Sequence, residues 1–178
     1  DDRSLALVGL LALDDLDAHL GKVGHHVFDL LGAVLIWRQD GVQFVEDRER
    51  QRIFVLIGGG NSNYRIIYTD GRTHAGQVGG DDDNPLYYGR AVAKWEGDAL
   101  SVDTRGFNED FWFTNGGLPH TEQLKLLEKF TRTDFDTLKY EVTIDDLGAY
   151  TRSWSSGWTL RWVANEELPR HLCQENRP

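Results

Sequence analysis

The stretch that decides the fold is Lys94-Trp95-Glu96-Gly97-Asp98-Ala99-Leu100-Ser101-Val102. Two alternating segments flank Glu96-Gly97-Asp98, and a glycine-containing turn between such segments is typical of a β-hairpin. We therefore expect two antiparallel strands joined by a tight turn. Similar short segments, separated by Gly and Asp or Asn turns, extend from Val42 to Val163.

Eight segments in this region have the alternation of strands. They are residues 42–46, 52–58, 64–69, 90–95, 99–105, 123–132, 137–145 and 157–164. Consecutive hairpins form a meander, and eight strands are enough to close a small barrel. The expected fold class is mainly β: an eight-stranded antiparallel up-and-down, lipocalin-like barrel domain over residues 42–178.

Residues 1–41 have a different pattern. Leu5, Val8, Ala12, Leu16 and Leu20 recur at helical spacing, which predicts an N-terminal helical segment. Its apolar stripe could cover the barrel or a second subunit, so a homo-oligomer held together by these helices is one expectation.

Composition excludes several classes of function. The formal net charge is −10, with no basic stripe for a phosphate backbone, so we expect no nucleic-acid partner. The most apolar stretch, residues 4–13, is too short for a membrane span, and we expect none. Cys173 is the only cysteine, so an internal disulfide is excluded.

Four motifs in fixed order carry a resemblance to a known family. They are Lys94-Trp95-Glu96-Gly97-Asp98 continuing to Val102-Asp103-Thr104 and Gly106-Phe107-Asn108; Gly117-Leu118-Pro119-His120-Thr121-Glu122; Val142-Thr143-Ile144-Asp145-Asp146 with Ala149-Tyr150-Thr151; and Cys173-Gln174-Glu175-Asn176. Over residues 41–176 the chain resembles an uncharacterised family of exported, β-rich proteins from soil bacteria. The resemblance implies an exported, periplasmic or secreted bacterial protein and assigns no chemistry. Residues 1–41 depart from the family, which has an extended segment containing Cys and Pro in their place.

Two long inserts interrupt the strand pattern. The first, residues 70–89, carries Asp70, Arg72 and His74, which could reach a ligand at the barrel mouth or simply form a turn. The second, residues 106–122, contains Trp112 and Phe113 and is expected to form a lid or rim over the mouth.

Several aromatic residues keep step with the apolar positions of the strands. They are expected in the core or in the wall of a pocket, and they are Tyr64, Tyr68, Trp95, Tyr140, Trp158 and Trp162. Among them, Tyr140 is the predicted ligand contact.

The segment 123–132 carries the candidate catalytic residues. Alternation places Glu128 and Arg132 on the same face as Leu124, Leu126 and Phe130. The same parity, extended backwards, brings His120 and Glu122 toward the mouth. A histidine and two carboxylates there could perform general acid/base work, with Arg132 or Arg72 stabilising developing negative charge. In the alternative interpretation, Glu128 and Arg132 form a structural ion pair and His120 caps a turn.

A divalent metal is a further hypothesis. Asp81 and Asp83 follow two glycines and offer oxygen ligands suited to calcium, although a solvated acidic turn is the favoured explanation. The spacing of His120 and Glu122 is a weak signal for zinc, because further ligands must come from elsewhere.

Two functions follow from this pattern. The first is a hydrolase of a small, largely apolar ester, lactone or similar electrophile, using general acid/base or metal-assisted attack of water in a barrel pocket. The alternative is a non-catalytic, lipocalin-like binding protein for a hydrophobic small molecule. Both predict a small-molecule partner.

Overall fold

The computed structural model describes residues 10–13, 41–57, 64–74, 85–110, 118–163, 165 and 168 of the 178-residue chain, the first stretch by its backbone alone. Within them lie nine strands: β1 (Leu10–Leu13), β2 (Val42–Asp47), β3 (Arg52–Ile57), β4 (Tyr64–Tyr68), β5 (Arg90–Glu96), β6 (Ala99–Arg105), β7 (Lys125–Arg132), β8 (Thr137–Asp145) and β9 (Trp154–Val163).

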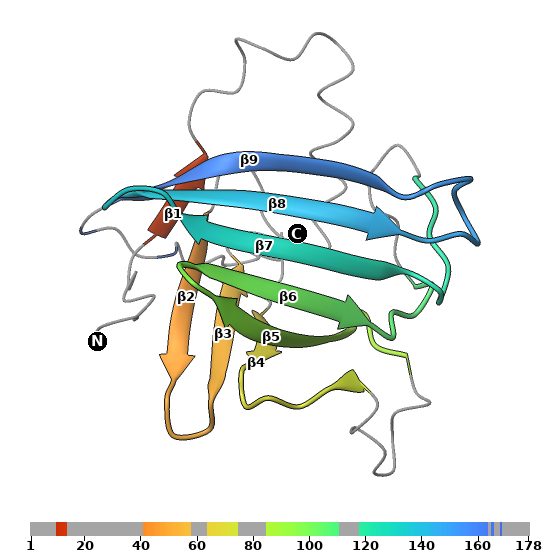
Figure 1. Cartoon of the computed structure of the whole chain (residues 1–178), viewed down its shortest axis with the longest axis horizontal. Helices are drawn as coiled ribbons and strands as arrows, with labels where there is room; N and C mark the ends of the chain where they lie inside the picture. The colour runs from red at the N-terminus through yellow and green to blue at the C-terminus, as the bar shows by residue number, and fades with distance from the viewer. Residues whose placement is uncertain are drawn as a thin grey trace, which may run out of the picture.

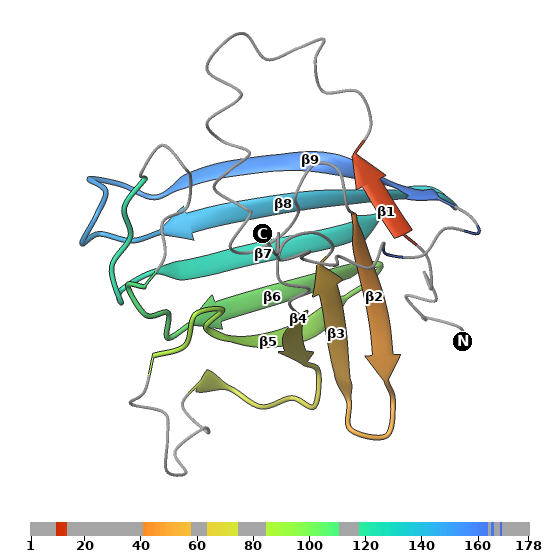
Figure 2. The same ribbon diagram turned by 180° about the vertical axis from the view of Figure 1, so that it is seen from behind.

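Strands β2 to β9 form one strongly curled sheet in the order of the sequence. In Figure 1, β5 to β9 make a broad layer, and β2 and β3 run steeply across it. Figure 2 shows the same two layers from behind, with β2 and β3 nearer the viewer. The short β1 pairs with β9 along its length and with β2 at Leu11 and Val42, so the strand order closes on itself.

The mainly β class and the eight strands after residue 41 are confirmed, with shifted ends: β7 begins at Lys125, and β9 begins at Trp154 rather than at residue 157. The all-antiparallel expectation is wrong for one pair, because β4 and β5 are parallel, with Ile67 opposite Ala91. The expected helix is wrong at Leu10–Leu13, which form a strand in the same sheet. The remainder of that segment lies outside the described residues.

The inner face of the sheet is apolar and tightly packed at its centre. Phe44 from β2 contacts Phe130 from β7 with ring centroids 5.5 Å apart. Tyr140 lies 4.8 Å from Phe130 and 4.7 Å from Trp158, which extends this aromatic contact to β9. Each fully buried side chain of this size contributes about 1.5–3 kcal/mol of hydrophobic stabilisation. A polar group at this depth therefore needs partners.

Candidate functional site

Glu128 is the central residue of a polar network inside the sheet. It lies on β7 between two apolar inward positions, and its side chain has no exposed surface. One oxygen, Oε1, accepts hydrogen bonds from Arg65 Nη1 at 2.9 Å and from the Tyr140 hydroxyl at 3.0 Å. The other oxygen, Oε2, accepts from Arg65 Nη2 and from the Thr104 hydroxyl at 3.2 Å. The carboxylate thus receives four hydrogen bonds from three strands.

Arg65 enters the network from β4, the strand across the interior from β7. Its side chain is 2% exposed, and its Nη2 also donates to Thr104 Oγ1 at 2.7 Å. Burial alone would lower the pKa of Arg65, but the adjacent Glu128 carboxylate raises it above its usual value. Arg65 is therefore a permanent cation with a buried anion beside it.

Tyr140 and Thr104 complete the network from β8 and β6. Burial, reinforced by the charge of Glu128, raises the pKa of Tyr140 well above its ordinary value of 10.0. Its hydroxyl therefore stays protonated at neutral pH and donates to the carboxylate. Apolar residues in place of a buried ion pair often give a protein of equal stability. The stability of the fold therefore does not by itself require these four polar residues.

The buried polar groups around the network that lack a hydrogen-bond partner among the described residues are all donors. Four buried nitrogens have no acceptor among the described residues: Arg65 Nε and the indole Nε1 atoms of Trp154, Trp158 and Trp162. The three tryptophans share the inner face of β9 and form what we call the tryptophan row. A buried donor without an acceptor costs about 1–3 kcal/mol, so four of them in one interior need a physical reason.

The tryptophan row also differs from its neighbours in exposure. The inward residues of β8, from Leu138 to Ile144, are all buried, whereas Trp154, Trp158 and Trp162 keep part of their surface exposed. Trp158 is in ring contact with Tyr140, which connects this exposed surface to the buried network. A molecule that lies against β9 would therefore be one aromatic ring away from the ion pair.

A second cluster fixes the segment that precedes β7. The buried carboxylate of Asp146, just after β8, accepts from the Thr121 backbone at 2.6 Å and from its hydroxyl at 2.7 Å. It also accepts from the amides of Gly148 and Ala149 at 3.0 and 3.2 Å. We call these four residues the Asp146 clamp. Because it immobilises Thr121, it also fixes the backbone beside His120.

The predicted catalytic residues do not all lie together. His120 is buried, with Nδ1 3.4 Å from the Thr121 carbonyl oxygen, while Glu122 is exposed in a turn. Arg132 lies at the far end of β7 and donates to the carbonyls of Asp134 and Phe135. The alternative of an ion pair between Glu128 and Arg132 is wrong, because Glu128 pairs with Arg65.

The predicted ligand contacts are also divided. Asp70 and Arg72 form an ion pair at 2.6 Å, and the Arg72 guanidinium lies 3.7 Å from the centre of the Tyr68 ring. The hydrogen bond from Arg72 lowers the pKa of Asp70 below its usual value. His74 Nε2 lies 3.2 Å from the Asp103 carbonyl oxygen. These contacts are near the outer face of the sheet, whereas Tyr140 points inward.

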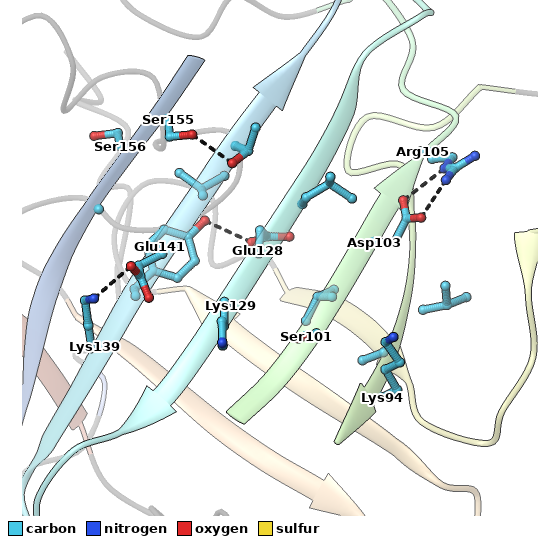
Figure 3. Close-up of a pocket in the computed structure, with 18 of the residues that line it drawn as sticks. Lys94, Ser101, Asp103, Arg105, Glu128, Lys129, Lys139, Glu141, Ser155 and Ser156 are labelled. Carbon is cyan, nitrogen blue, oxygen red and sulfur yellow. Dashed lines mark hydrogen bonds and ion pairs between the residues drawn. The ribbon is translucent and has the colours of Figure 1, made fainter. Parts of the chain in front are cut away.

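The outer face of β5 to β9 carries a broad depression of about 1350 Å³. Figure 3 shows Lys94, Lys129, Lys139 and Glu141 among its lining residues, and Glu128 is labelled in the same view. Lys94 pairs with Glu96 at 2.6 Å, and Lys139 pairs with Glu141 at 2.7 Å. Such exposed pairs are typical of the solvated face of an antiparallel sheet. We therefore place the candidate site on the inner face, where charge is desolvated.

The sequence pattern missed Arg65, Thr104 and Trp154. Both faces of Tyr64-Arg65-Ile66-Ile67-Tyr68 carry apolar residues, and the expected orientation of this strand is wrong: Tyr64 is 56% exposed, and Arg65 points inward. The sequence signal that could have indicated an inward Arg65 is its position directly before Ile66 and Ile67. Four of the predicted site residues, Trp112, Phe113, Asp81 and Asp83, lie outside the described residues.

No family model, curated protein or solved structure matches the chain. Within the described part of the chain, no three His, Cys, Asp or Glu side chains are grouped so that they could hold a metal ion. The same part contains no helix long and apolar enough to cross a membrane.

Proposed function

We propose that the protein binds a small, largely apolar molecule against the inner face of β9, in the manner of a lipocalin. The observation that carries this proposal is the tryptophan row, which faces inward and yet keeps exposed surface. Large aromatic side chains with a few fixed polar groups beside them are the usual lining of a small-molecule site. The network of Glu128 and Arg65 would hold the neighbouring wall rigid.

The same geometry gives less support to the hydrolase. A general base needs a free lone pair directed at the attacking water, and both oxygens of Glu128 already accept two hydrogen bonds each. Arg132, proposed to stabilise negative charge, is bonded to the turn after β7. Hydrolysis through His120 and Glu122 stays a prediction, and the experiment below includes it as an outcome.

The test is a titration with Nile red, a neutral dye whose emission rises in apolar surroundings. We expect saturable binding to the full chain and at least a tenfold loss of affinity in Trp158→Ala, because the exposed aromatic wall is removed. Tyr64→Ala, which removes an exposed aromatic residue from the outward face of β4, is the matched control and should bind as the wild type does.

Absence of saturable binding, or equal affinity in Trp158→Ala and wild type, would contradict the proposal. Turnover of a p-nitrophenyl ester that is abolished in His120→Ala would favour the hydrolase instead. Folding of each variant is checked by near-UV circular dichroism.

A further inference from the structure

We infer that the ligand is a neutral molecule that presents an oxygen acceptor, such as a ketone, ester or lactone, to the indole N–H of Trp158. This inference rests on the proposed function and specifies its chemical class. It depends on which hydrogen-bonding groups of the inner face are already occupied and which are not.

The first step is to determine whether the unpartnered polar groups of the inner face are hydrogen-bond donors or acceptors. The Glu128 carboxylate has two donors on each oxygen, and the hydroxyls of Thr104 and Tyr140 donate to it. The unpartnered buried atoms named above are all N–H groups. A site with spare donors favours a ligand with acceptors, because each new bond removes the cost of an unsatisfied buried donor.

The second step is the position of the donor. Trp158 is the middle residue of the tryptophan row, and its ring centroid lies 4.7 Å from that of Tyr140. It is partly exposed, although its Nε1 is buried without an acceptor among the described residues. A small shift of the indole would therefore offer the N–H to a molecule lying against the exposed part of the ring.

The third step is charge. Arg65 and Glu128 neutralise each other, so the network has no net charge to offer a ligand. A buried carboxylate on the ligand would lie near Glu128 without a cation of its own, and an isolated buried ion is strongly disfavoured. A neutral carbonyl gains the hydrogen bond without this penalty.

The experiment compares three probes of similar shape by isothermal titration calorimetry on the full chain. Benzophenone carries a carbonyl, diphenylmethane replaces that carbonyl with a methylene group, and diphenylacetate adds a carboxylate. We expect benzophenone to bind about fivefold to tenfold more tightly than diphenylmethane, which corresponds to one neutral hydrogen bond, and diphenylacetate to bind most weakly.

Trp158→Phe keeps an aromatic ring and removes the N–H. It should weaken benzophenone by about the same fivefold to tenfold and leave diphenylmethane unchanged. Trp95→Phe, on the inner face of β5, is the control and should change neither. If a variant fails to fold, the affinities of the wild-type protein for the three probes still test whether the ligand is a neutral oxygen acceptor.

The outcomes separate this inference from the proposed function. Equal binding of benzophenone and diphenylmethane, or tightest binding of diphenylacetate, would overturn the neutral-acceptor class while leaving a binding protein. Failure of all three probes together with Nile red would overturn both.

Discussion

At the residue scale, the charge of Glu128 persists inside the protein because hydrogen bonds from Arg65, Thr104 and Tyr140 replace the water it loses. Arg65→Met removes the counter-charge and leaves a buried carboxylate uncompensated. We expect a loss of about 3–5 kcal/mol in the free energy of unfolding, measured by urea titration at pH 7.

The double variant Arg65→Met with Glu128→Leu provides the control for that loss. It removes both charges and leaves only the Tyr140 and Thr104 hydroxyls without their acceptor. We expect it to be within about 1–3 kcal/mol of wild type, and therefore more stable than Arg65→Met. A double variant no more stable than the single one would show that the pair is not coupled in the way the structure indicates.

Tyr140 gives the network a dependence on pH. Because its pKa is raised in the folded protein, its contribution to stability is complete below the unfolded value near 10.0 and is lost as pH rises toward the folded value. Tyr140→Phe lacks this titration and, at pH 7, loses about 1–3 kcal/mol because Glu128 loses a donor. The stability difference between wild type and Tyr140→Phe should therefore shrink above pH 10 in urea titrations at pH 7 to 11. A constant difference across that range would contradict the assignment.

Alternation along β7 was enough to predict that Glu128 points inward, but not which cation it meets. Arg132 shares its strand and face, yet four residues of extended chain separate them by about 13 Å. The actual partner, Arg65, is 63 positions away in sequence and reaches Glu128 only after the sheet has curled. A face can be inferred from local pattern, whereas a partner depends on the tertiary fold.

At the scale of elements, the Asp146 clamp joins the segment before β7 to the turn between β8 and β9. Asp146→Ala removes the acceptor of the Thr121 amide, the Thr121 hydroxyl and the Gly148 amide, whereas the Ala149 amide keeps its bond to the Asp146 carbonyl. We expect a loss of about 2–3 kcal/mol in the free energy of unfolding. Hydrogen exchange should show the Thr121 and Gly148 amides losing protection first.

The neighbouring Asp145 is the matched control. Its carboxylate is partly exposed, and its ion pair with Lys125 is long, at 4.0 Å. Asp145→Ala should therefore cost less than about 1 kcal/mol and leave the Thr121 amide protected. Equal effects of the two substitutions would indicate that the clamp adds nothing beyond an ordinary surface carboxylate.

Strand positions were predictable because the hairpins are local. The turn at Gly97, with a positive φ of 64°, fixes the pairing of β5 with β6 through residues adjacent in sequence. The parallel contact of β4 with β5 was not predictable in this way, since a long insert separates them and no turn chemistry determines the direction of return. The start of β9 was missed because Ser155 and Gly157 are typical of loops.

At the scale of the whole molecule, β1 is the strand that closes the sheet into a ring within the described part of the chain, since it pairs with β9 at four positions and with β2 at one. Residues of β1 show helical spacing in the sequence, yet their backbone forms a strand. The sheet edges of β2 and β9 are what impose this conformation, because unpaired edge groups are satisfied by an added strand. Helical periodicity is here overridden by tertiary pairing.

Leu11→Pro tests this closure, because proline removes a ladder donor and disfavours the middle of a strand. Leu11 pairs with both Trp162 and Val42, so amide exchange should accelerate in β9 and at the start of β2, with a lower Tm. Exchange of the amides that join β7 to β8 should be unaffected, because the pairing of these two strands does not involve β1. Leu11→Ala, which keeps the backbone donor, is the control. Unchanged exchange in β9 of the proline variant would mean that β1 does not hold the two edges together, and the tryptophan row would then lie along a free edge.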